Sequence, residues 1–338
     1  MYIDWNITMA INTHNEPNFS GNWLQTENPN TLLIPSTLRV VSDSIYINPS
    51  KFGVHTHQAT LYADGEEMKV EWTERLGTSL ILGNPLVCIV PKAAQANYVQ
   101  GVLPIERLEL ITEPNSSFNI FSTALPTWFD NPDILEKAIL FWEMLDDKNK
   151  LLLNAVLLDN EFFQRFCEGP SSTNHHHAYR NGNLEHTLEV INIASENVFF
   201  ADKANLQLTL IFAWLHDIGK ADEYQPSYSP DKKYKLTATG YLHGHQLTGL
   251  YKVLEARAKF VPNYPESTFS HLRHLMAVKM GDDPLNHRKP QMIEHELVQS
   301  ADILSAKNNL HRDAFCGLPF GKHPATGFGK IPNFRYEL

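Results

Sequence analysis

The sequence is short of cysteine, of long apolar runs and of basic residues. It holds 3 cysteines in 338 residues and no C-x-x-C pair, so we expect neither a disulfide framework nor a thiolate metal site. No apolar run reaches the roughly 20 residues that a membrane-spanning helix needs. The N-terminus also lacks the basic and apolar regions of a signal peptide. We therefore expect a cytoplasmic protein with no membrane partner.

The shortage of basic residues bears on the substrate. The chain carries 28 Lys and Arg against 38 Asp and Glu, a formal net charge of −10. Residues 1–130 hold 13 acidic and 6 basic residues, a difference of −7 (6 − 13). Non-specific binding to nucleic acids depends on basic side chains that neutralise phosphates. Any polyanion must therefore be held locally, by metal ions and a few placed cations.

The N-terminal half has the periodicity of short strands. Residues 37–47, 58–63, 68–72, 85–91 and 102–111 alternate in polarity or are rich in β-branched residues. Asp64-Gly65, between two of these segments, is a hairpin signal. About five short strands with turn signals favour a small barrel. We predict a β-rich, OB-like domain over residues 1–125, in which residues 1–30 have no assigned element.

From residue 131 the periodicity becomes helical. Asn131 can cap a helix, and Pro132 is tolerated at the first helical position. Apolar residues then recur at helical spacing in segments 148–158, 160–167, 184–199, 203–216, 245–259, 268–280 and 291–308. We predict an all-α bundle over residues 131–315, with an excursion or hairpin at 224–239 and an irregular tail at 316–338. The predicted fold class is therefore multi-domain α+β, a small β-barrel followed by a helical bundle.

One apolar helix ends in side chains that bind metals. The segment Phe212-Ala-Trp-Leu-His-Asp-Ile-Gly-Lys220 places an imidazole and a carboxylate side by side, at His216 and Asp217. An Asp at the buried end of a helix costs several kcal/mol unless it is paired or metal-bound. Further candidate ligands lie on other predicted helices or helix ends: His186, His245, His274 and Asp302. Imidazole and carboxylate ligands without thiolate suit Mn, Fe, Mg, Ni or Zn.

These candidates exceed the four ligands of a simple protein site, so we expect one or two divalent ions. Asp217 is the natural bridge because its carboxylate has two oxygens. Two ions roughly 3.5–4 Å apart can activate a water molecule and stabilise the attacking and leaving oxygens of a phosphoester. Lys220, one turn beyond the pair, would neutralise a phosphate oxygen; its alternative role is that of a cation at a helix C-terminus.

Single histidines have ordinary alternatives. A lone His beside apolar residues is more often an interior residue than a ligand, and this applies to His186 and His274 taken alone. His243 competes with His245 but precedes Gly244 and the expected helix. At most two of the consecutive histidines 175–177 can point into one site, so we expect a structural or substrate-side role for them. The remaining candidates we expect to be solvated: His287, His295, His311 and His323.

Four segments together resemble the HD-domain phosphohydrolases, and more narrowly the YhaM-type 3′→5′ exoribonucleases. They lie at 162–190, 215–220, 237–249 and 300–306 and contain His175-His-His-Ala-Tyr179, His186, His216-Asp217, Gly244-His245 and Asp302. The resemblance implies an HD domain, an N-terminal OB-like domain and metal binding through His186, His216, Asp217 and Asp302. We assign Asp217 and Lys220 to catalysis, and His177, Tyr179 and Lys220 to substrate binding.

The expected function is that of a metal-dependent phosphodiesterase acting at the 3′ ends of RNA or short oligonucleotides. One alternative is the same chemistry on a nucleotide or cyclic dinucleotide, which the low basic charge favours. Another is a metal-binding regulatory module of a mobile element or signalling system, against which the retention of every candidate ligand argues. The choice of metal, the substrate and the oligomeric state, including a homo-oligomer, stay open.

Overall fold

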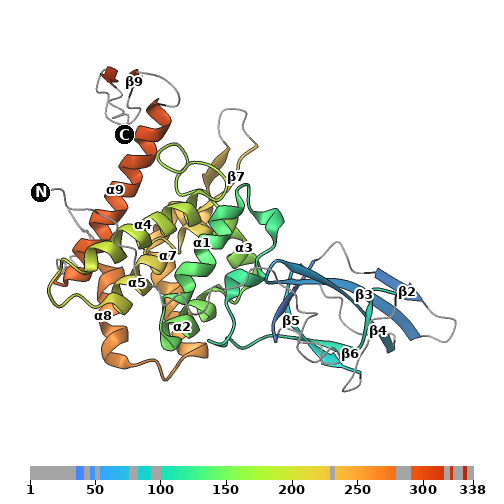
Figure 1. The fold of residues 1–338 in the computed structure, drawn as a ribbon. Helices are drawn as coiled ribbons and strands as arrows, with labels where there is room; N and C mark the ends of the chain where they lie inside the picture. Colours follow the sequence, from blue (N-terminus) through green and yellow to red (C-terminus); the bar gives the residue numbers. More distant parts are fainter. Residues whose placement is uncertain are drawn as a thin grey trace, which may run out of the picture.

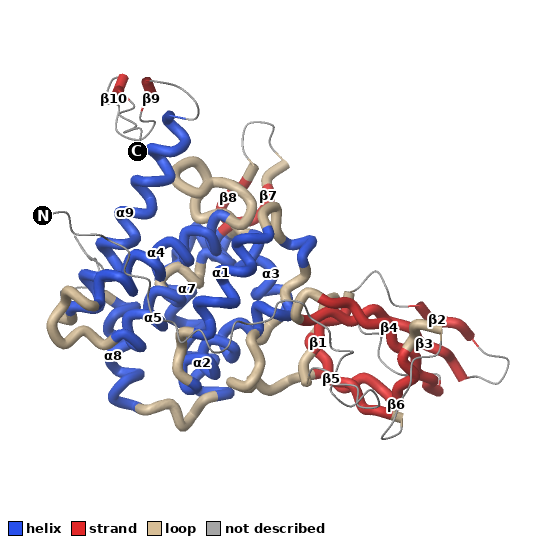
Figure 2. The backbone as a smooth tube through the Cα atoms, in the orientation of Figure 1, coloured by secondary structure: helices blue, strands red, loops and turns tan. Residues whose placement is uncertain are grey.

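The structure is a computed structural model that describes residues 36–41, 46–49, 54–75, 83–92, 100–228, 233–278, 291–315, 320–322 and 330–332. A strand-rich lobe lies beside a larger helical lobe (Figures 1 and 2). The expectation for residues 1–30 falls outside the described residues.

Five of the six strands of the first lobe close into a barrel. The strands are β1 (Leu38–Val40), β2 (Tyr46–Pro49), β3 (Val54–Ala63), β4 (Glu66–Arg75), β5 (Leu86–Pro91) and β6 (Leu103–Leu110). The sheet order is β1-β5-β6-β4-β3-β2, and an additional β1–β3 pairing closes the ring while β2 extends it. β4 and β6 pair in parallel, whereas the other strand pairs are antiparallel. This closure is consistent with the predicted OB-like barrel.

The β3–β4 hairpin turns where the sequence predicts. Ala63 pairs with Glu66, and both turn residues have positive φ, +49° at Asp64 and +83° at Gly65. This left-handed backbone suits a two-residue hairpin and favours Gly and Asp. Every second residue of a strand faces the barrel core, for example Leu61 in β3 and Val70 in β4, as expected for strands with one buried face.

The second lobe is a helical bundle. Its helices are α1 (Pro132–Glu143), α2 (Asp147–Leu157), α3 (Asn160–Glu168), α4 (Gly182–Val198), α5 (Leu206–Leu215), α6 (Lys220–Glu223), α7 (Ala238–Phe260), α8 (Glu266–Ala277) and α9 (Ile293–Phe315). The Asn131 side chain accepts a hydrogen bond from the Asp133 amide and Pro132 opens α1, as the sequence predicts. Within the described residues, no helix combines the length and apolar character needed to cross a membrane.

The helical lobe differs from a purely α-helical unit in three places. The predicted hairpin forms from β7 (Tyr224–Pro226) and β8 (Tyr234–Leu236). In the tail, expected to be irregular, β9 (Phe320–Lys322) and β10 (Lys330–Pro332) form a short antiparallel pair. The helical core also starts before residue 131, because two 3₁₀ turns, η2 (Ile120–Thr123) and η3 (Pro126–Trp128), pack into it.

Arg39 of β1 joins the two lobes. Its side chain is fully buried, and its Nε donates to the carbonyl oxygen of Thr123, 2.8 Å away. Its Nη1 donates to Oδ1 of Asn160 at 2.8 Å. The guanidinium also lies 5.1 Å from the ring centroid of Trp128 and 5.2 Å from that of Phe163. A buried charge is tolerated only when its donors are satisfied, and here the helical lobe supplies most of the partners.

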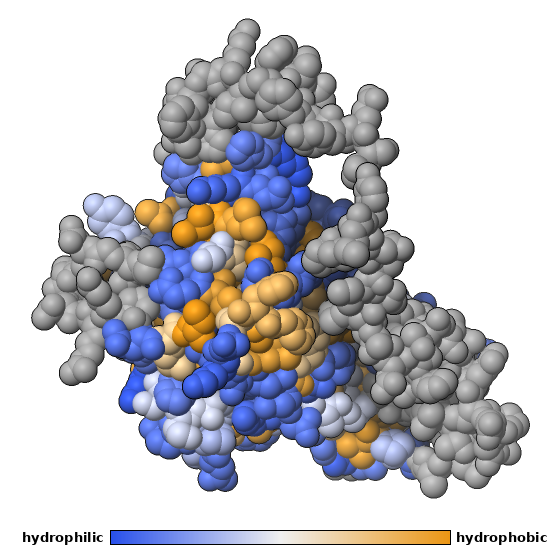
Figure 3. Space-filling view, turned by 60° about the vertical axis from the view of Figure 1, so that its left-hand side comes forward, coloured by the Kyte–Doolittle hydropathy of each residue, from blue (hydrophilic) through white to orange (hydrophobic). Residues whose placement is uncertain are grey.

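Part of the helical surface is apolar. Hydrophobic side chains gather on the face shown in Figure 3, which is turned forward from the left of Figure 1. Exposed examples on α9 are Ile293, Ile303 and Leu304, and Phe199 and Phe200 follow the end of α4. The surface of α9 is therefore more apolar than a helix with a single buried stripe requires.

Candidate metal centre

The end of α5 positions the central pair. Every residue of α5 from Leu208 to Leu215 is buried, so the helix ends with its C-terminal side chains inside the lobe. The turn that follows contacts α7 directly. A Cβ added at Gly219 would lie 2.0 Å from the carbonyl oxygen of His245, so only glycine permits this approach. The turn thereby brings Asp217 close to the residues of α7.

His216 presents one ring nitrogen to the site. Its Nδ1 lies 2.7 Å from the carbonyl oxygen of Ala213. A carbonyl only accepts hydrogen bonds, so Nδ1 must carry the proton, and Nε2 is left with a lone pair. Nε2 lies 3.4 Å from Oδ2 of Asp217 and is buried without a hydrogen-bond partner.

His186 of α4 is held in the same way. Its Nδ1 lies 2.9 Å from Oγ of Ser305, and the Ser305 hydroxyl donates to Oε2 of Glu189 at 2.6 Å. With its only proton donated, the hydroxyl accepts from Nδ1–H of His186. Nε2 of His186 then faces two carboxylates, 3.5 Å from Oδ2 of Asp217 and 3.0 Å from Oδ1 of Asp302.

His245 approaches the other oxygen of the same carboxylate. The backbone of α7 breaks at Gly244, where φ is 71° and ψ is 163°, so the helix restarts at His245. Nδ1 of His245 lies 2.8 Å from Oε2 of Glu223, and Nε2 lies 3.4 Å from Oδ1 of Asp217. His243, the alternative to His245, is exposed and does not line this cavity.

A metal ion fits this arrangement. His186, His216 and Asp217 form a group whose ligand atoms lie within 4.8 Å of one another. Nε2 of His186 and Nε2 of His216 are buried without hydrogen-bond partners, and each has a lone pair directed toward a carboxylate. Lone pairs and carboxylates repel unless a cation or a proton lies between them. Imidazole and carboxylate donors are also those that divalent metals use in proteins.

The Asp217 carboxylate is charged and strongly paired. Burial opposes its ionisation, but the ammonium of Lys220 and the imidazole of His216 outweigh burial and hold the pKa of Asp217 well below its usual value. Nζ of Lys220 contacts Oδ2 of Asp217 and donates to Oγ of Ser171 at 2.9 Å. Lys220 is therefore a paired interior cation and not a solvated charge at a helix end.

Two of the three consecutive histidines lie beside His186: the ring centroids of His176 and His177 are 5.0 and 5.2 Å from that of His186, and ligand atoms of the three lie within 4.8 Å of one another. His177 has a positive φ of 48°, and its ring is fully buried with Nε2 3.3 Å from Oε2 of Glu189. His176, one of the three histidines expected to have a structural or substrate-side role, lines the cavity. Burial and the neighbouring His186 and Lys220 lower the pKa of His176 to about 4. The hydroxyl of Tyr179 accepts hydrogen bonds from Asn309 and Arg312. His177 and Tyr179, assigned to substrate binding, are thus not among the lining residues.

Two further histidines lie differently from the expectation. From α8, Leu275 and Met276 line the cavity, while the proposed ligand His274 does not. His295, expected to be solvated, is only 5% exposed and lines the cavity. Position along α8 and α9 alone could not reveal this, because the helix rotations are set by packing against α5.

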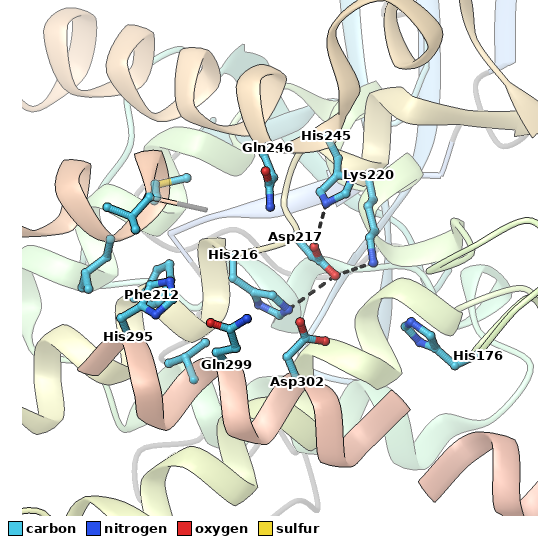
Figure 4. Close-up of a pocket in the computed structure, with 14 residues that line it drawn as sticks. His176, Phe212, His216, Asp217, Lys220, His245, Gln246, His295, Gln299 and Asp302 are labelled. Atoms are coloured by element: carbon cyan, nitrogen blue, oxygen red, sulfur yellow. Dashed lines mark ion pairs between the residues drawn. The ribbon is translucent and has the colours of Figure 1, made fainter. Parts of the chain in front are cut away.

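The cavity beside the ligands has a volume of about 340 Å³. Figure 4 shows Asp217 with His216, His245 and Lys220 around it, and Asp302 nearby on α9. The sequence reasoning missed Gln246 and Gln299, which also line it. Gln299 could have been found by helical spacing, since it precedes Asp302 by one turn, whereas Gln246 directly follows His245 and adjacent helical residues do not share a face.

No family model matches the chain. The chain is 25% identical over 179 residues to the 3′-5′ exoribonuclease YhaM of Geobacillus sp. (strain WCH70), covering 53% of each protein. It is 26% identical over 151 residues to the protein of the same name from Bacillus pumilus (strain SAFR-032), covering 44% of this chain and 46% of the relative. The chain spans about half the length of the curated relatives it matches. It is thus distantly similar to proteins of the YhaM type.

Proposed function

We propose that this chain is a metal-dependent phosphodiesterase of the HD type that removes nucleotides from the 3′ ends of RNA or short oligonucleotides. The observation that carries the proposal is the central carboxylate of Asp217. Its Oδ2 faces Nε2 of His186 and of His216, and its Oδ1 faces Nε2 of His245. The similarity to proteins named 3′-5′ exoribonucleases supports the choice of substrate.

The residues divide into two ligand groups that share one carboxylate. His186, His216, Asp302 and Oδ2 of Asp217 would hold one divalent ion, and His245 with Oδ1 of Asp217 would contribute to a second. When bound, such ions supply Lewis-acid chemistry, lowering the pKa of water and stabilising the charge that develops on a phosphoester. Ser305 and Glu223 support this set by occupying the Nδ1 side of His186 and of His245.

Lys220 and His176 are side chains of the cavity that can act on the phosphate of the substrate. Lys220 has its ammonium fixed by Asp217 and Ser171, so it offers a positioned positive charge to a phosphate oxygen. His176 is uncharged at physiological pH because its pKa is about 4. Its neutral ring can accept a proton or a hydrogen bond at the cavity wall.

A second candidate substrate is a small nucleotide or a cyclic dinucleotide. The cavity volume of about 340 Å³ lies at the lower end of the range for small-molecule sites. β4 carries four glutamates, at positions 66, 67, 71 and 74, against Lys69 and Arg75. A strand with this excess of acidic over basic residues is unfavourable for a phosphate backbone, whereas single-strand binders use a basic groove.

A side-by-side hydrolysis assay tests both candidates. The purified chain is incubated with Mn²⁺ and, separately, single-stranded RNA, cyclic dinucleotides and deoxynucleoside triphosphates. We expect RNA to be shortened from its 3′ end, with Asp217→Asn as the inactive control. Cleavage of cyclic dinucleotides or triphosphates without cleavage of RNA would favour the small-nucleotide alternative. A protein that binds Mn²⁺ but hydrolyses none of them would instead support a regulatory metal-binding role.

A further inference from the structure

The cavity has a second half that the proposed chemistry does not use. In Figure 4, the metal-ligand set and Lys220 lie toward one side, while Phe212 and His295 lie at the other. Gln246 and Gln299 lie between these sides, on opposite walls. The wall around Phe212 is completed by apolar side chains of α8 and α9, including Leu275, Met276 and Val298. A charged group therefore fits one end of the cavity and an apolar group the other.

Gln299 has an unsatisfied acceptor at this cavity. Its Oε1 is buried and has no hydrogen-bond partner among the described residues, although the side chain lines the cavity. Leaving a buried acceptor unpaired costs free energy that a ligand can recover by donating to it. The natural complement of this atom is an N–H or O–H donor on a ligand that enters the cavity.

The far wall is aromatic and uncharged. The rings of Phe212 and His295 stack at a centroid distance of 6.1 Å and an interplanar angle of 25°. Burial, and to a lesser extent the neighbouring His274, lower the pKa of His295 below its usual value, so its ring is neutral at physiological pH. Planar bases pack favourably against aromatic and apolar side chains, and such stacking is available to all bases.

We infer that this half of the cavity is a nucleobase subsite, in which Gln299 accepts a hydrogen bond from the edge of a base packed against the Phe212 wall. The inference rests on the proposed function for the position of the phosphate, which lies at the ligand set. The three features are independent: an apolar wall, an unpaired acceptor and a volume of about 340 Å³ that suits one nucleotide and not a long strand. The ligand class is a nucleoside monophosphate or the 3′-terminal nucleotide of a chain.

Gln299 is in this view a specificity-determining residue. Adenine, guanine and cytosine carry an exocyclic amino donor on the edge of the base, whereas ribose 5-phosphate has no base at all. A ligand without the base should lose both the stacking and the hydrogen bond. A ligand that lacks only the amino donor should lose the hydrogen bond to Oε1 of Gln299 and keep the stacking.

The test is equilibrium binding, measured by calorimetry in Mn²⁺ on the full chain. The ligands are AMP, GMP, CMP, UMP, ribose 5-phosphate and purine riboside 5′-monophosphate, which is AMP without its amino group. We expect the tightest nucleotide to bind about tenfold more strongly than ribose 5-phosphate. A nucleotide with an amino group should bind the wild-type chain more tightly than its counterpart without one. AMP and purine riboside 5′-monophosphate are the matched pair for this comparison.

Substitution assigns the effect to a side chain. Gln299→Leu should weaken binding of the tightest nucleotide by about 3- to 10-fold and leave the affinity for ribose 5-phosphate unchanged. Gln164→Leu is the matched control, because Gln164 bonds to Glu168 on α3 and does not line the cavity. Phe212→Leu should reduce the difference in affinity between each nucleotide and ribose 5-phosphate.

Two results would overturn the inference: ribose 5-phosphate binding as tightly as every nucleotide, or Gln299→Leu weakening all ligands equally. The wild-type ligand series remains decisive even if the variants fail to fold. Failure of the proposed function looks different, because nucleotides would then show the base effect in binding while no phosphodiester is hydrolysed. Active hydrolysis without any base effect would remove the subsite and leave the proposed function intact.

Discussion

The hydroxyl of Ser305 lies 2.9 Å from Nδ1 of His186 and holds that imidazole with its Nε2 toward Asp217 and Asp302. Ser305 is itself fixed by Glu189. Burial opposes ionisation of Glu189, but hydrogen bonds with His177 and Ser305 outweigh burial and lower its pKa. Such outer partners fix the tautomer and orientation of a ligating histidine.

Ser305→Ala should therefore weaken metal binding without removing a ligand. The expected loss is about 10- to 100-fold in Mn²⁺ affinity, measured by calorimetry on metal-stripped protein. Ser300→Ala, an exposed position on the same helix, is the control and should bind Mn²⁺ like the parent chain. Equal affinities for the two variants would show that Ser305 does not orient His186.

Asp217→Asn should abolish both metal binding and turnover, because it removes the charge shared by the two ligand groups. It should also destabilise the metal-free protein by about 3 kcal/mol, since the buried Lys220 loses its partner. The double variant Asp217→Asn, Lys220→Met should recover part of that stability in urea denaturation while staying inactive. A single variant as stable as the parent would mean that the Lys220–Asp217 pair contributes little.

Metal affinity should fall as the pH is lowered, and the fall should begin at a pH above the usual pKa of histidine. Burial opposes protonation of His216, but the carboxylates of Asp217 and Asp302 outweigh burial and raise the pKa of His216. A raised pKa means that the proton is still held above pH ~6.5, where it competes with the metal, which binds only neutral imidazole.

Each displaced proton should lower the apparent Mn²⁺ affinity by about tenfold per pH unit below the pKa. Titrations at pH 8, 7 and 6 in buffers of different ionisation enthalpy would measure both the affinity and the protons released. His176 should not contribute, because its pKa of about 4 keeps it neutral throughout. A flat affinity between pH 8 and 6 would contradict the prediction.

Arg39→Leu should destabilise the chain by about 3 kcal/mol or more, because it leaves the carbonyl of Thr123 and the amide of Asn160 without their donor. It should also loosen the contact between the lobes. Urea denaturation followed by tryptophan fluorescence measures this, since Trp128 lies beneath the guanidinium. Arg107→Leu is the control: Arg107 is an exposed barrel residue paired with Glu106 and Glu109, and its loss should change stability little.

The position at which a helical fragment begins should determine its stability. A fragment starting near residue 130 omits Phe118, Ile120 and Phe121, which belong to the helical core, whereas one starting at residue 112 keeps them. We expect the longer fragment to have the higher melting temperature in metal-free buffer. Circular dichroism compares the two directly, and equal melting temperatures would show that the 3₁₀ turns are dispensable.

Much of this protein follows from local pattern in the sequence. The change from alternating to helical spacing near residue 131, the Asp64-Gly65 hairpin and the cap at Asn131 are short-range features, because each depends on neighbouring residues. The candidate ligands His186, His216, Asp217 and Asp302 were also predicted, and they lie together in the structure. Their residue types and spacing, with the family resemblance, sufficed for that.

Only the tertiary structure decided how those ligands are held and what else surrounds them. Ser305 meets His186 across 119 residues of sequence, and Arg39 reaches Asn160 across 121. His295 lines the cavity and His274 does not, because the rotations of α8 and α9 are set by packing against α5. Such contacts depend on side-chain packing between distant elements, which no local spacing encodes. The sequence alone thus determined the elements and the central candidate ligands, while packing determined their orientation and the second half of the cavity.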